Sequence, residues 1–237
     1  MKAIDNRIIA AAIIAVGIAV LGLCMKSGID NFANRGRKVT VKGLAEMEVP
    51  ANKVTWPIVT KQTGNDLVQL YADINATNAV VAKFLKQNGI PEADVSIDAP
   101  QVTDTWANQY ASNRPADRYL ITSVVTVTSK QVDKVRATIS KQGQLLNQGI
   151  AIVNDDYGTN AISYEYTDFK RIKPRMMDEA IENAQTTAEQ FAKKSGSSLG
   201  KIETAGQGQF EINDRDDHTP WIKQLRVVTT VTYSLKD

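Results

Sequence analysis

The chain has 237 residues, of which 43% are hydrophobic and 23% are charged, and its formal net charge is +2. Residues 1–38 hold six Lys or Arg and two Asp or Glu, so residues 39–237 carry 22 basic and 24 acidic side chains. This balance argues against a nucleic-acid-binding protein, which needs a basic surface. A single cysteine, Cys24, excludes an intramolecular disulfide and a cysteine metal site, so apolar burial must stabilise the folded part.

An apolar run of eighteen residues, 8–25, contains no charged side chain. A helix of this length rises about 27 Å at about 1.5 Å per residue, close to the ~30 Å hydrocarbon core of a bilayer. We therefore predict that residues 1–26 form an N-terminal membrane anchor or signal segment.

Two interpretations of this segment compete. A cleaved signal peptide would use Lys2 and Arg7 as its basic region and would need small residues before the cleavage point. Residues 20–25 read Val-Leu-Gly-Leu-Cys-Met, which lacks that spacing and favours an uncleaved anchor. Leu23 is also too large to precede a lipid-modified Cys24. Basic residues flank the run on both sides, so charge alone does not orient it in a membrane.

The polar, turn-rich stretch that follows predicts a short tether over residues 27–38. Apolar residues then alternate over residues 37–49 and again over 53–63, with Pro50 between the two runs. This pattern predicts two strands that pair as a hairpin. The folded domain is expected to span residues 39–237.

A helix is predicted next. Gly64-Asn65-Asp66 supplies a start signal, apolar residues recur at helical spacing from Leu67 to Leu85, and Asn88-Gly89 supplies a stop signal. These three features together indicate an amphipathic helix of about five to six turns.

The middle of the chain favours strands. Residues 95–105 predict one strand, and residues 106–118 predict a polar loop. Residues 119–128, YLITSVVTVT, give the strongest strand signal of the chain. The alternation of Thr and Val in this strand predicts that one of its faces is open to solvent.

A second helix is expected over residues 131–148, with Ser129 as its cap and Gly149 as its stop. Gly143 weakens the middle of this helix. A further strand is expected to begin at residues 150–154, where the pattern becomes apolar again.

The last part of the chain predicts a strand over residues 161–169, a long helix over 173–195 and two strands over 201–212 and 221–235. Pro174 is acceptable because it would lie in the first turn of the helix. The residues expected on the buried face of this helix are Met177, Ala180, Ile181, Ala184, Ala188, Phe191 and Ala192.

This order of elements predicts an α+β fold. Helices are expected to pack on a mostly antiparallel or mixed sheet, and one N-terminal transmembrane helix precedes them. The three helix-to-strand units share only their glycine stops, at Gly89, Gly149 and Gly196, so we infer no internal repeat.

Several short motifs occur in an order that resembles the SIMPL-domain family, with bacterial periplasmic members of the immunogenic and oxidative-stress-associated type. The motifs begin with Val39-x-Val41-x-Gly43-x-Ala45-Glu46, followed by Val49-Pro50-Ala51, and continue with Asn88-Gly89-Ile90, Val124 to Val127, Asp178-Glu179-Ala180, Leu199 to Ile202 and Val227 to Leu235. The resemblance implies an α+β envelope domain without established catalytic residues. It also implies that some members build large, ring-like homo-oligomers.

One dense cluster could carry chemistry, Asp214-Arg215-Asp216-Asp217-His218, which contains the only histidine. Three carboxylates beside a histidine suggest a metal site or a general base, as in a metal-dependent hydrolase that uses His218. The cluster lacks the spacing and glycine of a calcium loop, and charged residues between strands are usually a solvated turn. Asp155-Asp156 is interpreted as a turn for the same reason. We therefore assign no catalytic, cofactor or metal residue, and no nucleotide-binding or hydrolase motif is present.

Aromatic residues offer a second kind of site. Trp56, Trp106, Trp221, Tyr110 and Tyr157 could form a binding cleft or an oligomer contact, because aromatic residues are enriched at interfaces. The alternative is that they lie in the core or are scattered over the surface.

The leading hypothesis is a non-enzymatic cell-envelope protein that is membrane-anchored and self-assembles, as a scaffold, a channel-like ring or in stress protection. The expected location is the bacterial inner membrane, single-pass, with the folded domain in the periplasm; release into the periplasm after cleavage is the alternative. A second hypothesis is a module whose loops 106–118 and 214–221 bind an unknown ligand or partner. The strand over 227–235 carries little charge and would need to lie inside the sheet or be covered by a neighbouring subunit.

Overall fold

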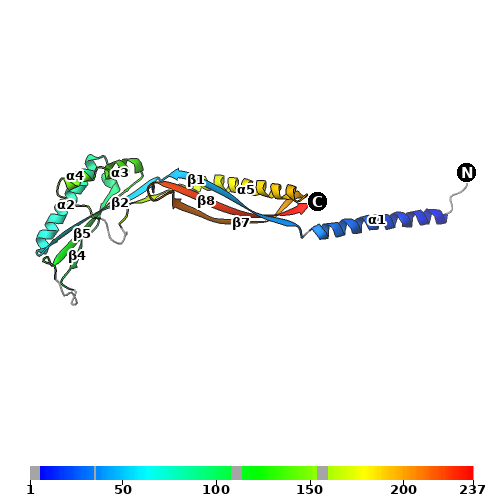
Figure 1. Cartoon of the computed structure of the whole chain (residues 1–237), viewed down its shortest axis with the longest axis horizontal. Helices are drawn as coiled ribbons and strands as arrows, with labels where there is room; N and C mark the ends of the chain where they lie inside the picture. Colours follow the sequence, from blue (N-terminus) through cyan, green and yellow to red (C-terminus); the bar gives the residue numbers. More distant parts are fainter. Residues whose placement is uncertain (1–5, 35, 108–113, 154–159, 237) are drawn as a thin grey trace. The chain divides into compact units, whose positions relative to one another are not determined.

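A computed structural model describes residues 6–34, 36–107, 114–153 and 160–236 (Figure 1). The chain divides into two compact units. The first, here called the three-stranded unit, comprises Met1–Met47, Ile172–Glu211 and Arg226–Asp237. The second, the five-stranded unit, comprises Glu48–Arg171 and Ile212–Leu225. The prediction of an α+β fold with helices on antiparallel sheets is confirmed, with two sheets in place of one.

Helix α1 spans Asn6–Asn34. Residues 27–34, predicted as part of a turn-rich tether, are therefore helical, because extending an existing helix costs far less than starting one and no proline interrupts the segment. Large apolar side chains are exposed on this helix, including Ile13, Ile18 and Leu23. Among the described residues, no helix is long and apolar enough to be a candidate membrane span.

The sheet of the three-stranded unit has the order β1-β8-β7. Its strands are β1 (Lys38–Pro50), β8 (Ile222–Lys236) and β7 (Ser198–Asp214). The last predicted strand of the chain is thus the central strand of this sheet. Buried and less buried residues alternate along β8, as expected for a strand with one face in a core.

Helix α5 (Phe169–Lys194) packs on this sheet and begins four residues before the predicted start, so Pro174 lies inside the helix. Its buried residues follow a spacing of four and are Met176, Ala180, Ala184, Ala188 and Ala192. The predicted inward positions of Ile181 and Phe191 are wrong, since these side chains are 37% and 59% exposed, and Met176 replaces Met177 as the buried methionine. The reason is that the alanine stripe, not the bulky residues, faces the sheet.

Gly43 of β1 explains why the alanine residues of α5 face the sheet. A Cβ atom at Gly43 would overlap the carbonyl oxygen of Ala180 and would lie 2.8 Å from the Cβ of Ala184. The backbone of β1 therefore approaches α5 so closely that only small residues fit on both sides. The core cluster around this contact consists of Val41, Ala184, Ala188, Val231 and Tyr233.

The sheet of the five-stranded unit is organised around β5 (Tyr119–Ser129). It pairs antiparallel with β2 (Lys53–Gly64), from Val54 opposite Ser129 to Gly64 opposite Tyr119. The short strands β3 (Val95–Ile97) and β4 (Gln101–Asp104) also pair with β5, and β6 (Ser163–Glu165) pairs with β2. The single strand predicted over 95–105 is therefore two short strands, preceded by the 3-10 turn η1 (Glu92–Asp94).

The predicted hairpin between residues 37–49 and 53–63 is wrong, because β1 and β2 belong to different sheets. The short link after Pro50 is held by other segments: Ala51 N–H donates to the Trp221 carbonyl at 2.8 Å and Asn52 N–H donates to the Glu165 carbonyl at 2.9 Å. The partner that β2 takes instead, β5, offers an uninterrupted ladder along the whole strand.

Helices α2 (Leu67–Gln87), α3 (Val132–Ile139) and α4 (Gly143–Leu146) cover one face of this sheet (Figure 1). The start and stop predicted for α2 are confirmed, since Asp66 Oδ1 accepts from Val68 N at 2.9 Å and Gly89 has a φ of +79°. The single helix predicted over 131–148 is divided before Gly143, and residues 150–153 form no strand. Large side chains fill the core, among them Trp56, Ile58, Val81, Leu85, Val125, Val127, Val135 and Leu145.

Candidate functional site

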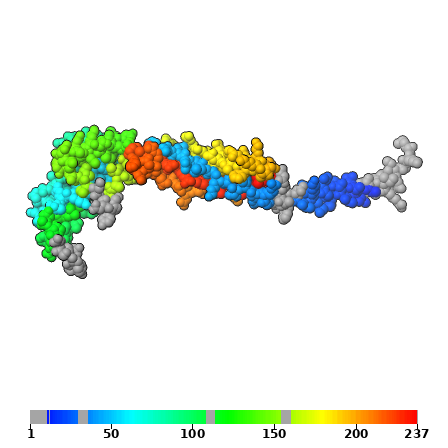
Figure 2. Space-filling view, viewed as in Figure 1, coloured from blue at the N-terminus to red at the C-terminus, as the bar shows by residue number. Residues whose placement is uncertain are grey.

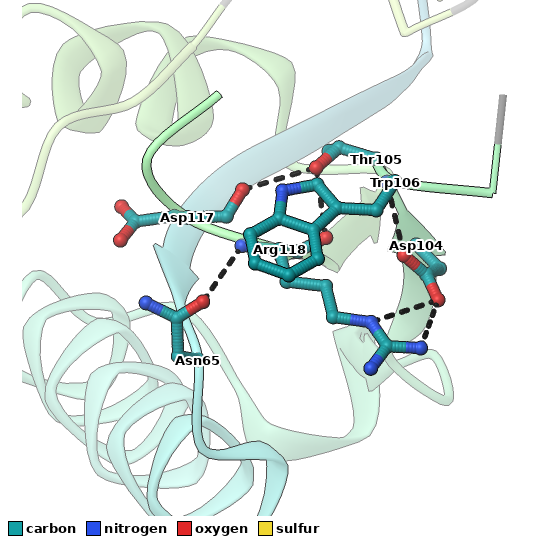
Figure 3. Close-up of polar contacts among 6 residues, drawn as sticks. All are labelled: Asn65, Asp104, Thr105, Trp106, Asp117 and Arg118. Carbon is teal, nitrogen blue, oxygen red and sulfur yellow. Dashed lines mark hydrogen bonds and ion pairs between the residues drawn. The ribbon is translucent and has the colours of Figure 1, made fainter. Parts of the chain in front are cut away.

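The loop that joins β4 to β5 is held at its base by an ion pair (Figure 3). Arg118 donates to Asp104 Oδ2 from Nε at 3.1 Å and from Nη2 at 2.8 Å. Asp104 Oδ1 also accepts from Trp106 N at 3.0 Å. The hydrogen bonds from Arg118 hold the pKa of the Asp104 carboxyl below its usual range. Both groups are therefore occupied with each other, which leaves Arg118 as a structural group and not as an anion-binding one.

A second set of contacts ties this loop to the start of α2. Arg118 N–H donates to Asn65 Oδ1 at 3.0 Å, and Thr63 Oγ1 donates to Asp117 Oδ2 at 2.6 Å. Thr105 Oγ1 donates to the carbonyl oxygens of Asp117 and Arg118 at 3.0 and 2.8 Å. Figure 3 shows Asn65, Thr105 and the adjacent residues Asp117 and Arg118 converging from three segments of the chain. The loop base is thus a fixed structure on which the exposed residues are presented.

Trp106 is the main exposed feature of this base. Its Nε1 donates to the Pro115 carbonyl at 3.0 Å, and the guanidinium carbons of Arg114 and Arg118 each lie 5.9 Å from its ring centroid. Trp106 stays 37% exposed. The first turns of α2, tied to the same loop, expose Leu67, Val68 and Tyr71 by 41%, 82% and 51%. We call these four residues the tip surface.

Two of the four residues of the tip surface, Trp106 and Tyr71, are of types enriched at protein interfaces. Tryptophan, tyrosine and arginine are the residue types that contribute most to binding at protein interfaces. Sequence analysis identified Trp106 and the loop over 106–118 but missed Leu67, Val68 and Tyr71. Helical periodicity could have found Val68, which lies off the face of the buried residues Leu70 and Ile74, but Leu67 has the spacing of that buried face.

The loop over 214–221 is organised by Asp216. This carboxylate accepts from His218 N at 2.9 Å, from Arg215 Nε at 3.0 Å and from the hydroxyl of Thr219. The hydrogen bond from Thr219, followed by that from Arg215, lowers the pKa of Asp216 to about 2. Asp214 pairs with Lys223. These carboxylates therefore stabilise the turn and form ion pairs with basic side chains of the same chain.

The side chain of His218 is exposed. Within the described ranges, no group of three or more His, Cys, Asp or Glu side chains is placed to hold a metal ion. The predicted cluster is adjacent in sequence, but the carboxylates of Asp214 and Asp216 are directed to Arg215, Thr219 and Lys223.

A third feature surrounds Trp221. The guanidinium carbon of Arg136 lies 3.6 Å from the Trp221 ring centroid, and the Tyr164 ring meets the Trp221 ring edge-on at 6.3 Å. Burial raises the pKa of Tyr164. These side chains line a hollow of about 500 Å³ together with Asp133, Ala137, Ile139 and Ser140. Sequence analysis missed Arg136, because its contact with Trp221 joins segments far apart in the chain.

The predicted aromatic set is therefore divided. Trp56 is 2% exposed and belongs to the core. Trp106 lies on the tip surface and Trp221 in the hollow. Tyr110, Tyr157 and the predicted Asp155-Asp156 turn lie outside the described residues.

Strand β7 differs from every other long strand of the chain in its exposure. Of its 17 residues, only Leu199, Gly200 and Phe210 are partly buried, and the rest are exposed. Figure 2 shows its atoms, in orange, at the surface of the three-stranded unit. Ile202 and Ile212 are 52% and 41% exposed. The strand thus presents apolar and backbone groups to solvent along its length.

A protein family matches the greater part of the chain. The family model described as "SIMPL: Protein of unknown function (DUF541)" matches residues 39–231. No curated protein matches the chain.

Proposed function

The chain belongs to the SIMPL family, and from that premise we propose that it is a non-enzymatic cell-envelope protein that is anchored in a membrane and self-assembles. The role that fits this combination is a scaffold, a channel-like ring or a stress-protective assembly. The proposed location is the bacterial inner membrane, with the folded units in the periplasm; cleavage and release into the periplasm is the alternative.

The observation that carries self-assembly is the exposed edge strand β7. A long strand at the end of a sheet offers unpaired N–H and C=O groups to another strand, and proteins normally shorten, charge or cover such edges. β7 has 17 residues and no proline, and residues 204–210 carry no charged side chain. A neighbouring subunit would cover this edge.

The support for anchoring is the composition of residues 8–25 and their place in a helix of 29 residues. The described apolar side chains of this helix are exposed, including Val16, Leu21 and Met25. Exposed apolar groups on several sides of one helix are stable in lipid or against copies of the same helix. Helices gathered at one end of an assembly would also gain binding strength from being linked to it.

The test of the proposed function is the native mass of the full-length protein. In detergent at micromolar concentration we expect a defined oligomer larger than a dimer by light scattering. In cell fractions we expect the protein to stay with the membrane after alkaline washing and to retain its first residues. A clean monomer refutes self-assembly, and a mature N-terminus near Ser27 refutes the anchor.

A second candidate function is a module that binds a partner protein. The observation that favours it is the tip surface, where Trp106, Val68 and Tyr71 are exposed on a base fixed by the Arg118 to Asp104 ion pair. A rigid base lowers the entropy cost of binding. A monomeric full-length protein, combined with loss of partner capture in a Trp106→Ala variant, would favour this function over self-assembly.

A further inference from the structure

The two edges of the three-stranded sheet are unequal. In the order β1-β8-β7, each edge strand pairs with β8 on one side only among the described strands. β1 carries Lys38 and Lys42 and ends in Pro50, all features that discourage further pairing. β7 is longer, about 56 Å at ~3.3 Å per residue, and its central residues, TAGQGQF over 204–210, carry no charge. The free edge of β7 is therefore the one open to another strand.

We propose that β7 pairs antiparallel with β7 of a second copy, with Gly206 opposite Gly206, so that the two sheets become one. This inference rests on the proposed self-assembly and names its contact. The strand order of the joined sheet is β1-β8-β7-β7-β8-β1, related by a two-fold axis. Because such an axis uses the same surface on both copies, the contact closes after two subunits, and a larger assembly contains an even number.

The charges of β7 select this register. With Gly206 at the axis, Lys201 lies opposite Glu211 of the second copy and Ile202 lies opposite Phe210, and each pair occurs twice. Opposite charges and apolar side chains that face each other across antiparallel strands are stabilising. Side chains alternate between the two faces of a sheet, so the two-fold axis can lie at a residue but not between two residues. The registers with the axis one residue to either side place less favourable side-chain pairs opposite each other.

A shift of the axis to Gln207 places Glu203 opposite Glu211, which opposes like charges twice. A shift to Ala205 places Lys201 opposite Gln209 and Glu211 opposite Leu199, which removes both favourable pairs. The register centred on Gly206 is therefore the one of the three that combines charge and apolar complementarity.

Contacts within one copy place two of these side chains, those of Glu211 and Phe210, on opposite faces of β7. Glu211 approaches Arg226 at 3.9 Å, and Arg226 is an exposed residue of β8 between the buried residues Leu225 and Val227. Lys173 of α5 lies 5.5 Å from the Phe210 ring. Glu211 thus points away from α5 and Phe210 points toward it. The ionic pairs would form on the open face of the joined sheet and the apolar pairs on its helical face.

Glycine positions decide which changes β7 tolerates. A Cβ atom at Gly208 would lie 2.5 Å from the Val228 carbonyl oxygen, so this glycine is needed for the contact with β8. A Cβ atom at Gly206 would meet nothing closer than 4.0 Å. The tests therefore use exposed non-glycine positions.

The first test measures distances between spin labels on full-length protein in detergent, with Cys24→Ser as background and one label per chain. A label at Gln209 is three residues from the axis. The labelled positions of the two copies are therefore six residues apart along the strand direction, or about 20 Å. A label at Ile202 is four residues from the axis, which gives about 26 Å. An axis at Ala205 would exchange these two values, and an axis at Gln207 would give about 13 and about 33 Å. Either pattern overturns the register.

The second test reverses charges. Lys201→Glu and Glu211→Lys should each weaken association by about tenfold, because two opposed pairs change sign, and the double variant should restore it. Glu182→Lys and Lys193→Glu are matched controls, since both side chains are exposed and belong to α5 and not to β7. Circular dichroism establishes that all variants are folded.

The outcomes separate this inference from the proposed function. Labels that show no separation below about 40 Å, or a double variant that fails to restore association, overturn β7 pairing. If the native mass is oligomeric in that case, self-assembly stands and uses another surface. If the native mass is that of a monomer, both proposals fall.

Discussion

The two sheets of this protein are stabilised in opposite ways. In the five-stranded unit, large side chains such as Trp56, Ile58 and Leu85 fill the space between the sheet and its helices. In the three-stranded unit, the alanine stripe of α5 and Gly43 bring the backbones together. The first arrangement gains stability from apolar area, and the second from close packing with little area per residue. The three-stranded unit is therefore the one more sensitive to added volume.

The edges of the two sheets also differ. The five-stranded sheet has the three-residue strands β3 and β6 at the ends of its order, and short edge strands resist pairing with other chains. The three-stranded sheet ends in the 17-residue strand β7. The long edge strand β7 is therefore the part of the two sheets on which the proposed self-assembly rests.

Removing volume should have the largest effect, in the five-stranded unit. Trp56 is 2% exposed, and Trp56→Ala should lower the free energy of unfolding by about 3–5 kcal/mol through lost burial and a cavity. Urea denaturation followed by circular dichroism measures the change. Trp106→Ala is the matched control, because Trp106 is 37% exposed and should cost much less. Equal losses for the two variants would contradict the packing argument.

Adding volume should have the next largest effect, in the three-stranded unit. Gly43→Ala places a methyl group against the backbone of Ala180 and should cost about 1–3 kcal/mol. Gly143→Ala is the control, because a Cβ atom there meets nothing within 4 Å and the change should not lower stability. Hydrogen exchange would show the loss of protection along β1 and α5. If Gly43→Ala is neutral, the close approach of β1 to α5 is wrong.

A smaller effect is expected at the start of α2. Asp66 Oδ1 accepts from Val68 N and Gln69 N at 2.9 and 3.2 Å, so Asp66→Ala should cost about 1 kcal/mol by leaving two N–H groups without their cap. Asp66→Asn keeps an acceptor and should retain most of the stability. Thermal unfolding distinguishes the two variants, and equal midpoints would contradict the capping role.

The loop over 214–221 should respond only at low pH. The pKa of Asp216 is lowered from 3.8 to about 2, chiefly by the hydrogen bond from Thr219. Because the folded pKa lies below the unfolded one, the stabilising contribution is complete above about pH 4 and is lost as pH falls through about 2. Nuclear magnetic resonance titration of the carboxyl carbon measures this pKa, and Thr219→Val should raise it toward 3.8. An unchanged pKa in that variant would contradict the assigned cause.

The smallest effect is expected at His218. Its side chain is exposed, so His218→Ala should change the free energy of unfolding by less than about 0.5 kcal/mol and should leave the phenotype of the strain intact. Complementation of a deletion strain at matched protein abundance measures the second quantity. A lost phenotype would revive the hydrolase hypothesis.

Local signals in the sequence determined much of the secondary structure. The alternation over 119–128 predicted β5, Asp66 and Gly89 predicted the ends of α2, and the residues from 201 onward predicted β7 and β8. Each of these signals acts within a few residues, through side-chain periodicity or a capping hydrogen bond, so it can be seen without a partner segment. The family resemblance was likewise carried by short motifs and was confirmed over residues 39–231.

Only the tertiary structure decided which strands pair and which faces are buried. The sequence predicted β1 and β2 as a hairpin, yet β1 pairs with β8 and β2 with β5, because the choice depends on competition among distant strands of similar composition. Periodicity alone also could not decide between Met176 and Met177, since the close approach at Gly43 sets the rotation of α5. The tip surface and the bare edge of β7 have the same origin. Whether a residue is exposed depends on which other segments of the chain cover it, and a local sequence pattern does not contain that information.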